Sequence, residues 1–232
     1  DTAAFATVHV QARPGLGVDV AKRGRVIIFF PHLPPGSMSN DGDIADVGGG
    51  VGWTSAIMAL HPKVAKVILV EPSNNRRRTN KYILKHFGVP EGKVEAIDGT
   101  FQNFNLKEKV DVVVLCSSIH HCYDDVIPLL FKNIKKCLTS QVGNAKVLIA
   151  NEHVVTKLWV LRRLGRYIIN IFLGQKDRTF FSLMNLRKPN PHDGEHWRIR
   201  SEVDHIIKKS GYSYRFFKNN GQFVEKMADF WP

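Results

Sequence analysis

The chain has 232 residues, of which 44% are hydrophobic and 23% charged, so it can bury the core of one large domain. Its 33 lysines and arginines outnumber its 21 acids, and the net charge of +12 favours nucleic acid, an anionic membrane surface or a negatively charged substrate as partner. No apolar run reaches the roughly 18 residues of a membrane span, and three cysteines without a CxxC pair give no disulfide framework. This composition argues against an integral membrane protein, and we expect a reduced, cytoplasmic setting.

The N-terminal segment is rich in proline and glycine, a composition that predicts an irregular arm over residues 1–42. The chain begins with Asp1 rather than Met and has no signal-peptide layout, so we expect its N-terminus to have been trimmed. Residues 43–232 are expected to form the main domain.

Beyond the arm, short apolar runs alternate with helical segments. Strands are predicted over residues 44–47, 67–70, 94–97, 110–115 and 145–150. Helices are predicted over residues 54–60, 74–86 and 124–138. This alternation is typical of βαβ units, whose strands form a parallel sheet with helices on both faces.

The last third of the chain has a different pattern. A long, apolar and basic segment fills residues 154–173, and a helix is predicted over residues 201–210. Two short strands follow, joined by the Asn-Asn-Gly turn of residues 219–221. We therefore predict an α/β fold with a seven-stranded, mostly parallel sheet, a C-terminal antiparallel hairpin, and a lid insertion over residues 154–198 between the fifth strand and the last helix.

A run of glycines follows the first predicted strand in DIADVGGGVGW, residues 43–53. Glycine turns sharply and has no Cβ, so this segment brings bare backbone to the edge of the sheet where α/β folds bind ligands. A dinucleotide fingerprint would need its third glycine at Trp53, and no Lys-Ser/Thr pair follows to make a P-loop. The loop instead offers the GxGxG spacing of Gly48, Gly50 and Gly52.

Glu71 closes the second predicted strand in LVEPS, where its carboxylate can accept hydrogen bonds from both ribose hydroxyls of a nucleoside. With this acid, the segments IADVGGGVG, VILVEPS, VDVVVLCSSIHHCYD and AKVLIANE resemble, in order, motifs of the class I S-adenosylmethionine-dependent methyltransferases. The resemblance covers residues 43–152, and residues 201–228 are similar to the family's final αββ segment. It implies a Rossmann-like fold, S-adenosyl-L-methionine as cofactor and methyl transfer as the reaction.

The resemblance also implies roles for the residues of the first two motifs. Asp46 and the backbone of the loop would hold the methionine part of the cofactor. Glu71 would bind the ribose hydroxyls, and Pro72 would pack beside the adenosine. The loop glycines assigned to the cofactor are Gly48, Gly49, Gly50 and Gly52.

The third motif departs from the family pattern. In AIDGTFQ, Thr100 stands where the family has an acid that binds the adenine amino group. Thr100 with Phe101 is therefore our first assignment for the adenine contact, and Asp98 is the second. Ser117, at the end of the fourth predicted strand, would line the site near the cofactor's sulfur. The arginines of residues 76–78 are expected to form a solvated helix face.

Candidate catalytic side chains follow the fourth and fifth predicted strands. Methyl transfer needs in-line positioning, and a base is needed only when the acceptor arrives protonated. His120 and His121 lie where the family places the reactive methyl, and either can take a proton from a hydroxyl or an amine. The alternative is that these histidines pack and cap the turn. Glu152 either anchors a cationic or hydroxylated acceptor or is a surface acid at a strand end.

The loop before the last predicted helix holds further polar side chains. His192 and His196 have the HxxxH spacing of a metal site on a helix, but neighbouring prolines and a glycine argue against a helix there, so we predict no metal site. Trp197 and Arg198 are better candidates for lid residues, and Trp197 fits the core equally well.

Residues 157–174 form a basic amphipathic pattern when projected at about 100° per residue. Arg162, Arg163 and Arg166 share one face, and leucines and isoleucines share the other. Three interpretations remain open: a cap that closes the pocket, an apolar lid over the substrate, or a helix lying on an anionic membrane surface.

We therefore predict an S-adenosylmethionine-dependent methyltransferase that acts on oxygen or nitrogen of a small organic acceptor, because the predicted cover is apolar and no added recognition domain is visible. One alternative is an RNA- or protein-directed methyltransferase that uses the basic surface, although CSSIHH stands where an Asn/Asp-Pro-Pro-Tyr/Phe motif would be expected. Another alternative is a binding module that keeps the fold without turnover.

Overall fold

The computed structural model describes residues 42–139, 146–150, 152, 154–174, 196–212, 215–218 and 224–229. Nearly all of the predicted N-terminal arm, the loop over residues 180–195 and the turn over residues 219–221 lie outside these residues.

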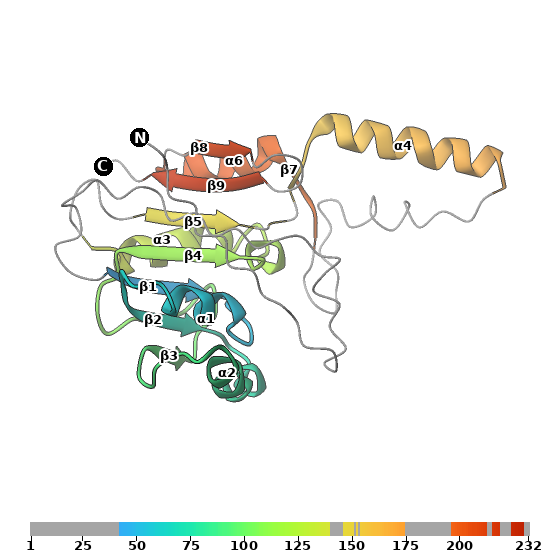
Figure 1. Cartoon of the computed structure of the whole chain (residues 1–232). Coiled ribbons are helices and arrows are strands. Elements are labelled where there is room, and N and C mark those ends of the chain that lie inside the picture. The colour runs from blue at the N-terminus through green and yellow to red at the C-terminus, as the bar shows by residue number, and fades with distance from the viewer. Residues whose placement is uncertain are drawn as a thin grey trace, which may run out of the picture.

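A single large sheet organises the domain, with strand order β3-β2-β1-β4-β5-β9-β8 (Figure 1). The first five strands along the chain are mutually parallel: β1 (Gly42–Val47), β2 (Val64–Val70), β3 (Val94–Ile97), β4 (Val112–Cys116) and β5 (Lys146–Ala150). β9 (Val224–Asp229) pairs antiparallel with β5, and β8 (Arg215–Lys218) pairs antiparallel with β9. The predicted α/β fold with a mostly parallel sheet is confirmed, with five parallel strands.

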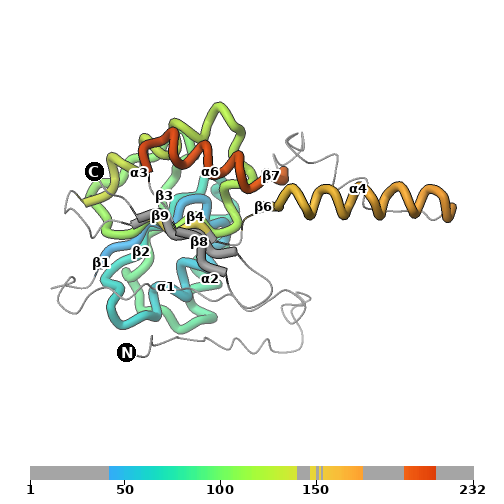
Figure 2. Tube along the Cα trace, turned by 90° about the horizontal axis from the view of Figure 1, so that it is seen from above, coloured from blue at the N-terminus to red at the C-terminus, as the bar shows by residue number. Residues whose placement is uncertain are grey.

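Helices cover both faces of the sheet (Figure 2). α1 (Trp53–Ala59) and α2 (Asn74–Phe87) lie on one face, and α3 (Ile127–Cys137) and α6 (Arg200–Lys209) lie on the other. α2 is bounded by the Ser73 hydroxyl, which accepts a hydrogen bond from the Arg76 N–H, and by Gly88 in a left-handed conformation. The helix predicted from residue 124 starts only at Ile127, because Pro128 fits its first turn and the preceding residues form turns.

The core has two halves, one on each side of the sheet. Successive strand residues point to opposite faces, so Ala45 and Val47 of β1 join the cluster under α3 and α6, while Ile44 joins the cluster under α1. The central strands are buried on both faces, as a parallel sheet requires. This packing holds the five parallel strands in place, and their carboxyl ends lie along one edge of the sheet.

Strand order reverses between β1 and β4, because β2 and β3 follow β1 on one side while β5 follows β4 on the other. Open α/β sheets bind ligands in the crevice at such a switch point, at the carboxyl ends of the strands. The glycine loop after β1, Glu71 after β2 and the turn after β4 all reach this edge.

The inserted segment leaves the body between two short strands. β6 (Val154–Val155) and β7 (Arg198–Ile199) pair in parallel, and α4 (Lys157–Phe172) between them projects away from the sheet (Figures 1 and 2). None of the residues of α4 is buried. Within the described residues, no helix is both long and apolar enough to cross a membrane.

Candidate active site

The loop between β1 and α1 runs through three left-handed glycines. Gly48, Gly50 and Gly52 have φ angles of 75°, 62° and 90°, which side chains rarely tolerate. A Cβ on Gly48 would lie 2.8 Å from the Cβ of Ser118, whereas a Cβ on Gly50 would meet no atom within 4 Å. The loop is therefore packed tightly at Gly48 and open at Gly50, and a ligand can approach the backbone on that open side.

Glu71 points its buried carboxylate at this loop. Oε2 accepts a hydrogen bond from the Gly50 N–H at 3.1 Å, and Oε1 accepts one from the Ser73 N–H at 3.0 Å. A carboxylate oxygen has two lone pairs, so each oxygen keeps acceptor capacity for a ribose hydroxyl. This arrangement fits the predicted ribose contact.

Asp46 lies beneath the loop and is fully buried. Its Oδ2 accepts a hydrogen bond from the Ser55 hydroxyl at 2.7 Å, and its Oδ1 has no hydrogen-bond partner among the described residues. Burial raises the pKa of Asp46 from 3.8 to about 6; the hydrogen bond from Ser55 opposes this shift and the charge of Glu71 adds to it. An unpaired acceptor here fits a cationic group, such as the ammonium of the cofactor's methionine part.

Replacing Asp46 with asparagine is expected to stabilise the cofactor-free protein by about 1–2 kcal/mol above pH 6. The folded-state pKa lies above the unfolded value, so the wild type loses stability as the pH rises from about 3.8 to about 6, and the full deficit persists at higher pH. Urea unfolding at pH 7.5 and at pH 4 measures the difference, with Asp125→Asn at an exposed aspartate as control. A gain that is the same at both pH values would contradict an origin in the Asp46 charge.

The residues considered for the adenine contact have separate environments. Asp98 is 76% exposed and forms an ion pair of 2.7 Å with Arg77. The Thr100 hydroxyl accepts a hydrogen bond from the Asn103 N–H within a turn. Phe101 alone of the three reaches the glycine loop, since a Cβ on Gly48 would lie 3.1 Å from its ring.

The second helix begins with three arginines that do not share one environment. Arg76 and Arg78 are exposed, as predicted. Arg77 is largely buried and bridges the Glu71 carbonyl oxygen and Asp98, so the prediction of a solvated face was wrong for this residue. Pro72, beside Glu71, is exposed.

β4 ends in a strained turn against the same loop. Ser117 has a φ of 52°, the only positive value of a non-glycine residue in the described part of the chain. The next residue, Ser118, is buried beside Gly48, and no described residue forms a hydrogen bond with its hydroxyl. The sequence predicted Ser117 as a site residue and did not single out Ser118, which lies against Gly48 of the glycine loop.

Glu152 accepts hydrogen bonds from the backbone of the turn after β4, which contains the 3₁₀ helix η2 (Ile119–His121). Oε1 accepts hydrogen bonds from the N–H groups of Ser118 at 2.8 Å and Ile119 at 2.9 Å. Oε2 accepts one from the His120 N–H at 3.0 Å and lies 2.8 Å from His120 Nδ1. The side chain is only 4% exposed, so the interpretation of Glu152 as a surface acid was wrong.

The contact with Glu152 orients the His120 ring. A carboxylate can only accept, so Nδ1 carries the proton and Nε2 is the other ring nitrogen. The ring of His121 lies against that of His120, with 4.3 Å between centroids. Both histidines follow β4 at the edge that carries Glu71 and the glycine loop.

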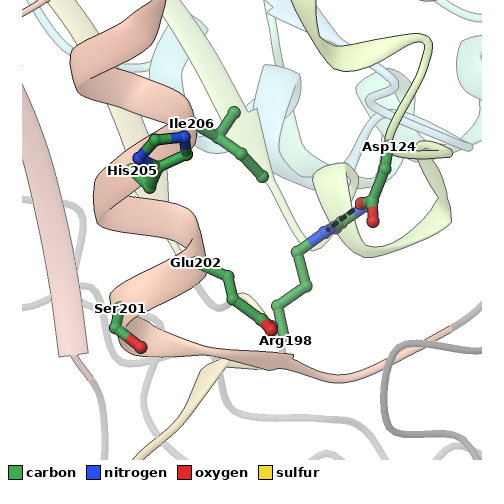
Figure 3. Close-up of a pocket in the computed structure, with 6 residues that line it drawn as sticks. All are labelled: Asp124, Arg198, Ser201, Glu202, His205 and Ile206. Carbon is green, nitrogen blue, oxygen red and sulfur yellow. Dashed lines mark hydrogen bonds and ion pairs between the residues drawn. The ribbon is translucent and has the colours of Figure 1, made fainter.

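Arg198 holds the other side of this turn from β7 (Figure 3). Its guanidinium is buried, donates to Asp124 Oδ1 at 3.0 and 3.1 Å and to the Ile119 carbonyl at 2.9 Å, and also donates to the Cys122 carbonyl. Arg198 therefore braces η2 and is not an exposed lid residue. With Ser201, Glu202, His205 and Ile206 of α6, Arg198 and Asp124 line a cavity of about 410 Å³.

Both ends of the inserted segment thus attach to η2, through Glu152 before β6 and Arg198 in β7. Trp197 stacks on Trp159 of α4, with ring centroids 5.3 Å apart. His196 is buried and donates its backbone N–H to the His120 carbonyl. His192 lies outside the described residues, and among those that are described no cluster of His, Cys, Asp and Glu suits a metal ion.

Comparison with known proteins agrees with this fold. Residues 44–141 match the family model of a methyltransferase domain, while no curated protein matches. A putative O-methyltransferase from Nostoc punctiforme is 18% identical, with 83% of this chain and 52% of that chain covered and a TM-score of 0.62. N,N-8-amino-8-demethyl-D-riboflavin dimethyltransferase from Streptomyces davawensis is 19% identical, with 81% of this chain and 49% of that chain covered and a TM-score of 0.56. DhpI, in a complex with SAH, is 13% identical, with 82% of this chain and 78% of that chain covered and a TM-score of 0.55.

The fold is an open α/β domain in which the glycine loop and the buried Glu71 carboxylate lie at the carboxyl ends of the parallel strands. Residues 44–141 match a methyltransferase domain, so this part of the chain has the fold and the motifs of the class I, Rossmann-like methyltransferases, whose cofactor is S-adenosylmethionine. The chain spans about half of the length of the Nostoc and Streptomyces proteins.

Proposed function

We propose that this protein transfers the methyl group of S-adenosylmethionine to oxygen or nitrogen of a small organic acceptor. The observation that carries the proposal is the buried Glu71 carboxylate, hydrogen-bonded to Gly50 at the switch point of the sheet. The putative O-methyltransferase and the riboflavin-type dimethyltransferase with a similar fold support methylation at oxygen or nitrogen, since their names describe it, and the second name describes a small organic acceptor.

The chain's own residues would position the reactants. When bound, S-adenosylmethionine supplies an electrophilic methyl group on a sulfonium. Gly50 and Glu71 would hold the nucleoside, with Asp46 beneath the loop and Phe101 beside it. Because displacement at a methyl group depends on alignment, these positioning contacts would supply most of what the reaction needs.

His120 is the best candidate for proton transfer from the acceptor. Glu152 holds its Nδ1–H, so that Nε2 is the nitrogen that would receive a proton. His121 is the alternative. Glu152 has both oxygens engaged with η2, so we assign it to positioning His120 and no longer to anchoring the acceptor.

Isothermal titration calorimetry with S-adenosylmethionine tests the first part of the proposal, with NAD⁺ as a control ligand. We expect one molecule of S-adenosylmethionine to bind and NAD⁺ not to bind. No detectable binding of S-adenosylmethionine to the intact protein would overturn the enzyme assignment.

A methyl-transfer screen tests the acceptor class. Radiolabelled S-adenosylmethionine is incubated with pools of small phenols and amines, with total RNA and with protein extract. We expect label in small molecules. Label in RNA, with the steep salt dependence of phosphate binding, would favour the RNA-directed alternative that the +12 charge suggests.

A further inference from the structure

Helix α4 stands apart from the rest of the molecule. Its 16 residues follow the N-cap residue Thr156, whose hydroxyl accepts a hydrogen bond from the Trp159 N–H, and they extend away from the sheet (Figures 1 and 2). An isolated helix of this length is only marginally stable in water, because tertiary packing normally supplies most of its stability. A helix that buries none of its residues therefore needs another surface.

Five of the exposed apolar side chains of α4 share one face. At about 100° per residue, this face spans about 100° of the helix circumference, and its terminal Phe172 is 85% exposed. No described side chain covers this face. We call it the apolar face of α4; it consists of Leu161, Leu164, Ile168, Ile171 and Phe172.

The opposite face carries the three arginines of the helix. Arg162, Arg163 and Arg166 lie there, and no aspartate or glutamate occurs between residues 156 and 174. Long arginine side chains at the margin of an apolar face can place their guanidinium groups among lipid headgroups while their stems stay on apolar surface.

The contact between α4 and the body leaves the apolar face pointing outward. Trp159 projects among the arginines, stacks on Trp197 at 5.3 Å and carries the guanidinium of Arg163 over its ring at 5.0 Å. The helix is therefore attached to the body through its polar side at its N-terminal end. A lid over the substrate would need the reverse orientation, with the apolar face toward the sheet.

We propose that α4 docks the protein on an anionic lipid bilayer, with its apolar face in the interfacial region and Arg162, Arg163 and Arg166 at the headgroups. A basic amphipathic helix with these properties lies in the plane of the interface. The net charge of +12 adds attraction to anionic lipid. A second copy of the chain is a poorer occupant, because a two-fold pairing of α4 would bring two cationic helices together without an acid to neutralise them.

Vesicle co-sedimentation tests this docking independently of methyl transfer. We expect binding to vesicles of phosphatidylcholine with phosphatidylglycerol, weak binding to phosphatidylcholine alone, and partial release by salt. Arg162→Gln, Arg163→Gln and Arg166→Gln together should weaken binding on the order of a hundredfold, since each cation contributes about fivefold. Leu164→Asp with Ile168→Asp should abolish it.

Matched variants on α2 and α3 distinguish docking through α4 from attraction by the overall positive charge of the protein. Leu129→Asp changes an exposed leucine on α3, and Arg78→Gln, Lys81→Gln and Lys85→Gln together remove three cations from α2. Both controls should keep most of the vesicle binding, and all variants should keep their circular dichroism and their affinity for S-adenosylmethionine. Equal losses in the α2 and α4 charge variants, or no binding to anionic vesicles, would overturn the proposal. So would a dimer in sedimentation equilibrium that Leu164→Asp dissociates.

Discussion

Replacing Glu71 with alanine is expected to weaken the binding of S-adenosylmethionine by about a hundredfold or more. A hydrogen bond to a charged group contributes about 1.5–3 kcal/mol, and the variant loses an acceptor for both ribose hydroxyls. The Gly50 N–H also loses its partner, so the open part of the loop is no longer fixed against β2. Calorimetry measures the affinity, and thermal unfolding shows whether the fold is intact.

Glu71→Gln refines this test, because glutamine keeps the shape and one oxygen. Glu71 accepts from Gly50 on one oxygen and from Ser73 on the other, so the glutamine amide must face one of these N–H groups donor to donor. We expect a loss of about tenfold in affinity. Glu95→Gln on β3, at a glutamate paired with Lys66 near the surface, should bind the cofactor like the wild type. Wild-type affinity in Glu71→Ala would refute the ribose assignment.

The features that were predicted correctly from the sequence depend on single residues and their near neighbours along the chain. Left-handed backbone at Gly48, Gly50 and Gly52 is a property of the glycines themselves, and the strand at Ile44 to Val47 follows from an apolar run next to them. Glu71 could be placed because a parallel strand ends at the ligand-binding edge. Helices and strands before residue 139 accordingly lie within a few residues of their predicted bounds.

The contacts that the sequence did not predict join residues that are distant along the chain. Arg77 lies 21 residues from Asp98, Glu152 lies 32–34 residues from the turn that it caps, and Arg198 lies 74 residues from Asp124. When only the neighbours in sequence are considered, each of these charged side chains is expected to lie on the surface. One signal was available: β4 and β5 are adjacent parallel strands, so an acid after β5 must lie near the turn after β4.

The orientation of α4 also depends on a contact between residues that are distant along the chain. Its two faces follow from the spacing of arginines and leucines, but that spacing is equally compatible with a lid, a cap or a membrane contact. The stacking of Trp159 on Trp197 supports the membrane contact that we propose, because it attaches the helix by its polar side. A pair of aromatic side chains 38 positions apart gives no periodic signal in the sequence.

Replacing Glu152 with glutamine is expected to lower the rate of methyl transfer by about a hundredfold while S-adenosylmethionine binding changes less than about threefold. Glutamine can still accept from Ser118 and Ile119 with its oxygen, but its amide then faces the N–H and the Nδ1–H of His120 as a second donor. This conflict releases the His120 ring, and it should cost about 2–4 kcal/mol of the free energy of unfolding because a buried charged acceptor is lost. Rates are measured with the acceptor that the screen identifies.

A double-mutant cycle separates proton transfer from simple bracing of η2. If Glu152 acts on the rate through His120, Glu152→Gln should have little further effect on the rate in a His120→Gln background. Glu202→Gln is the matched control, since Glu202 accepts a backbone N–H from Ile199 at the start of α6. That variant should lose stability without losing rate. Additive rate losses in the cycle would show that the carboxylate serves the turn alone, and the base would then have to be sought in His121 or in the acceptor itself.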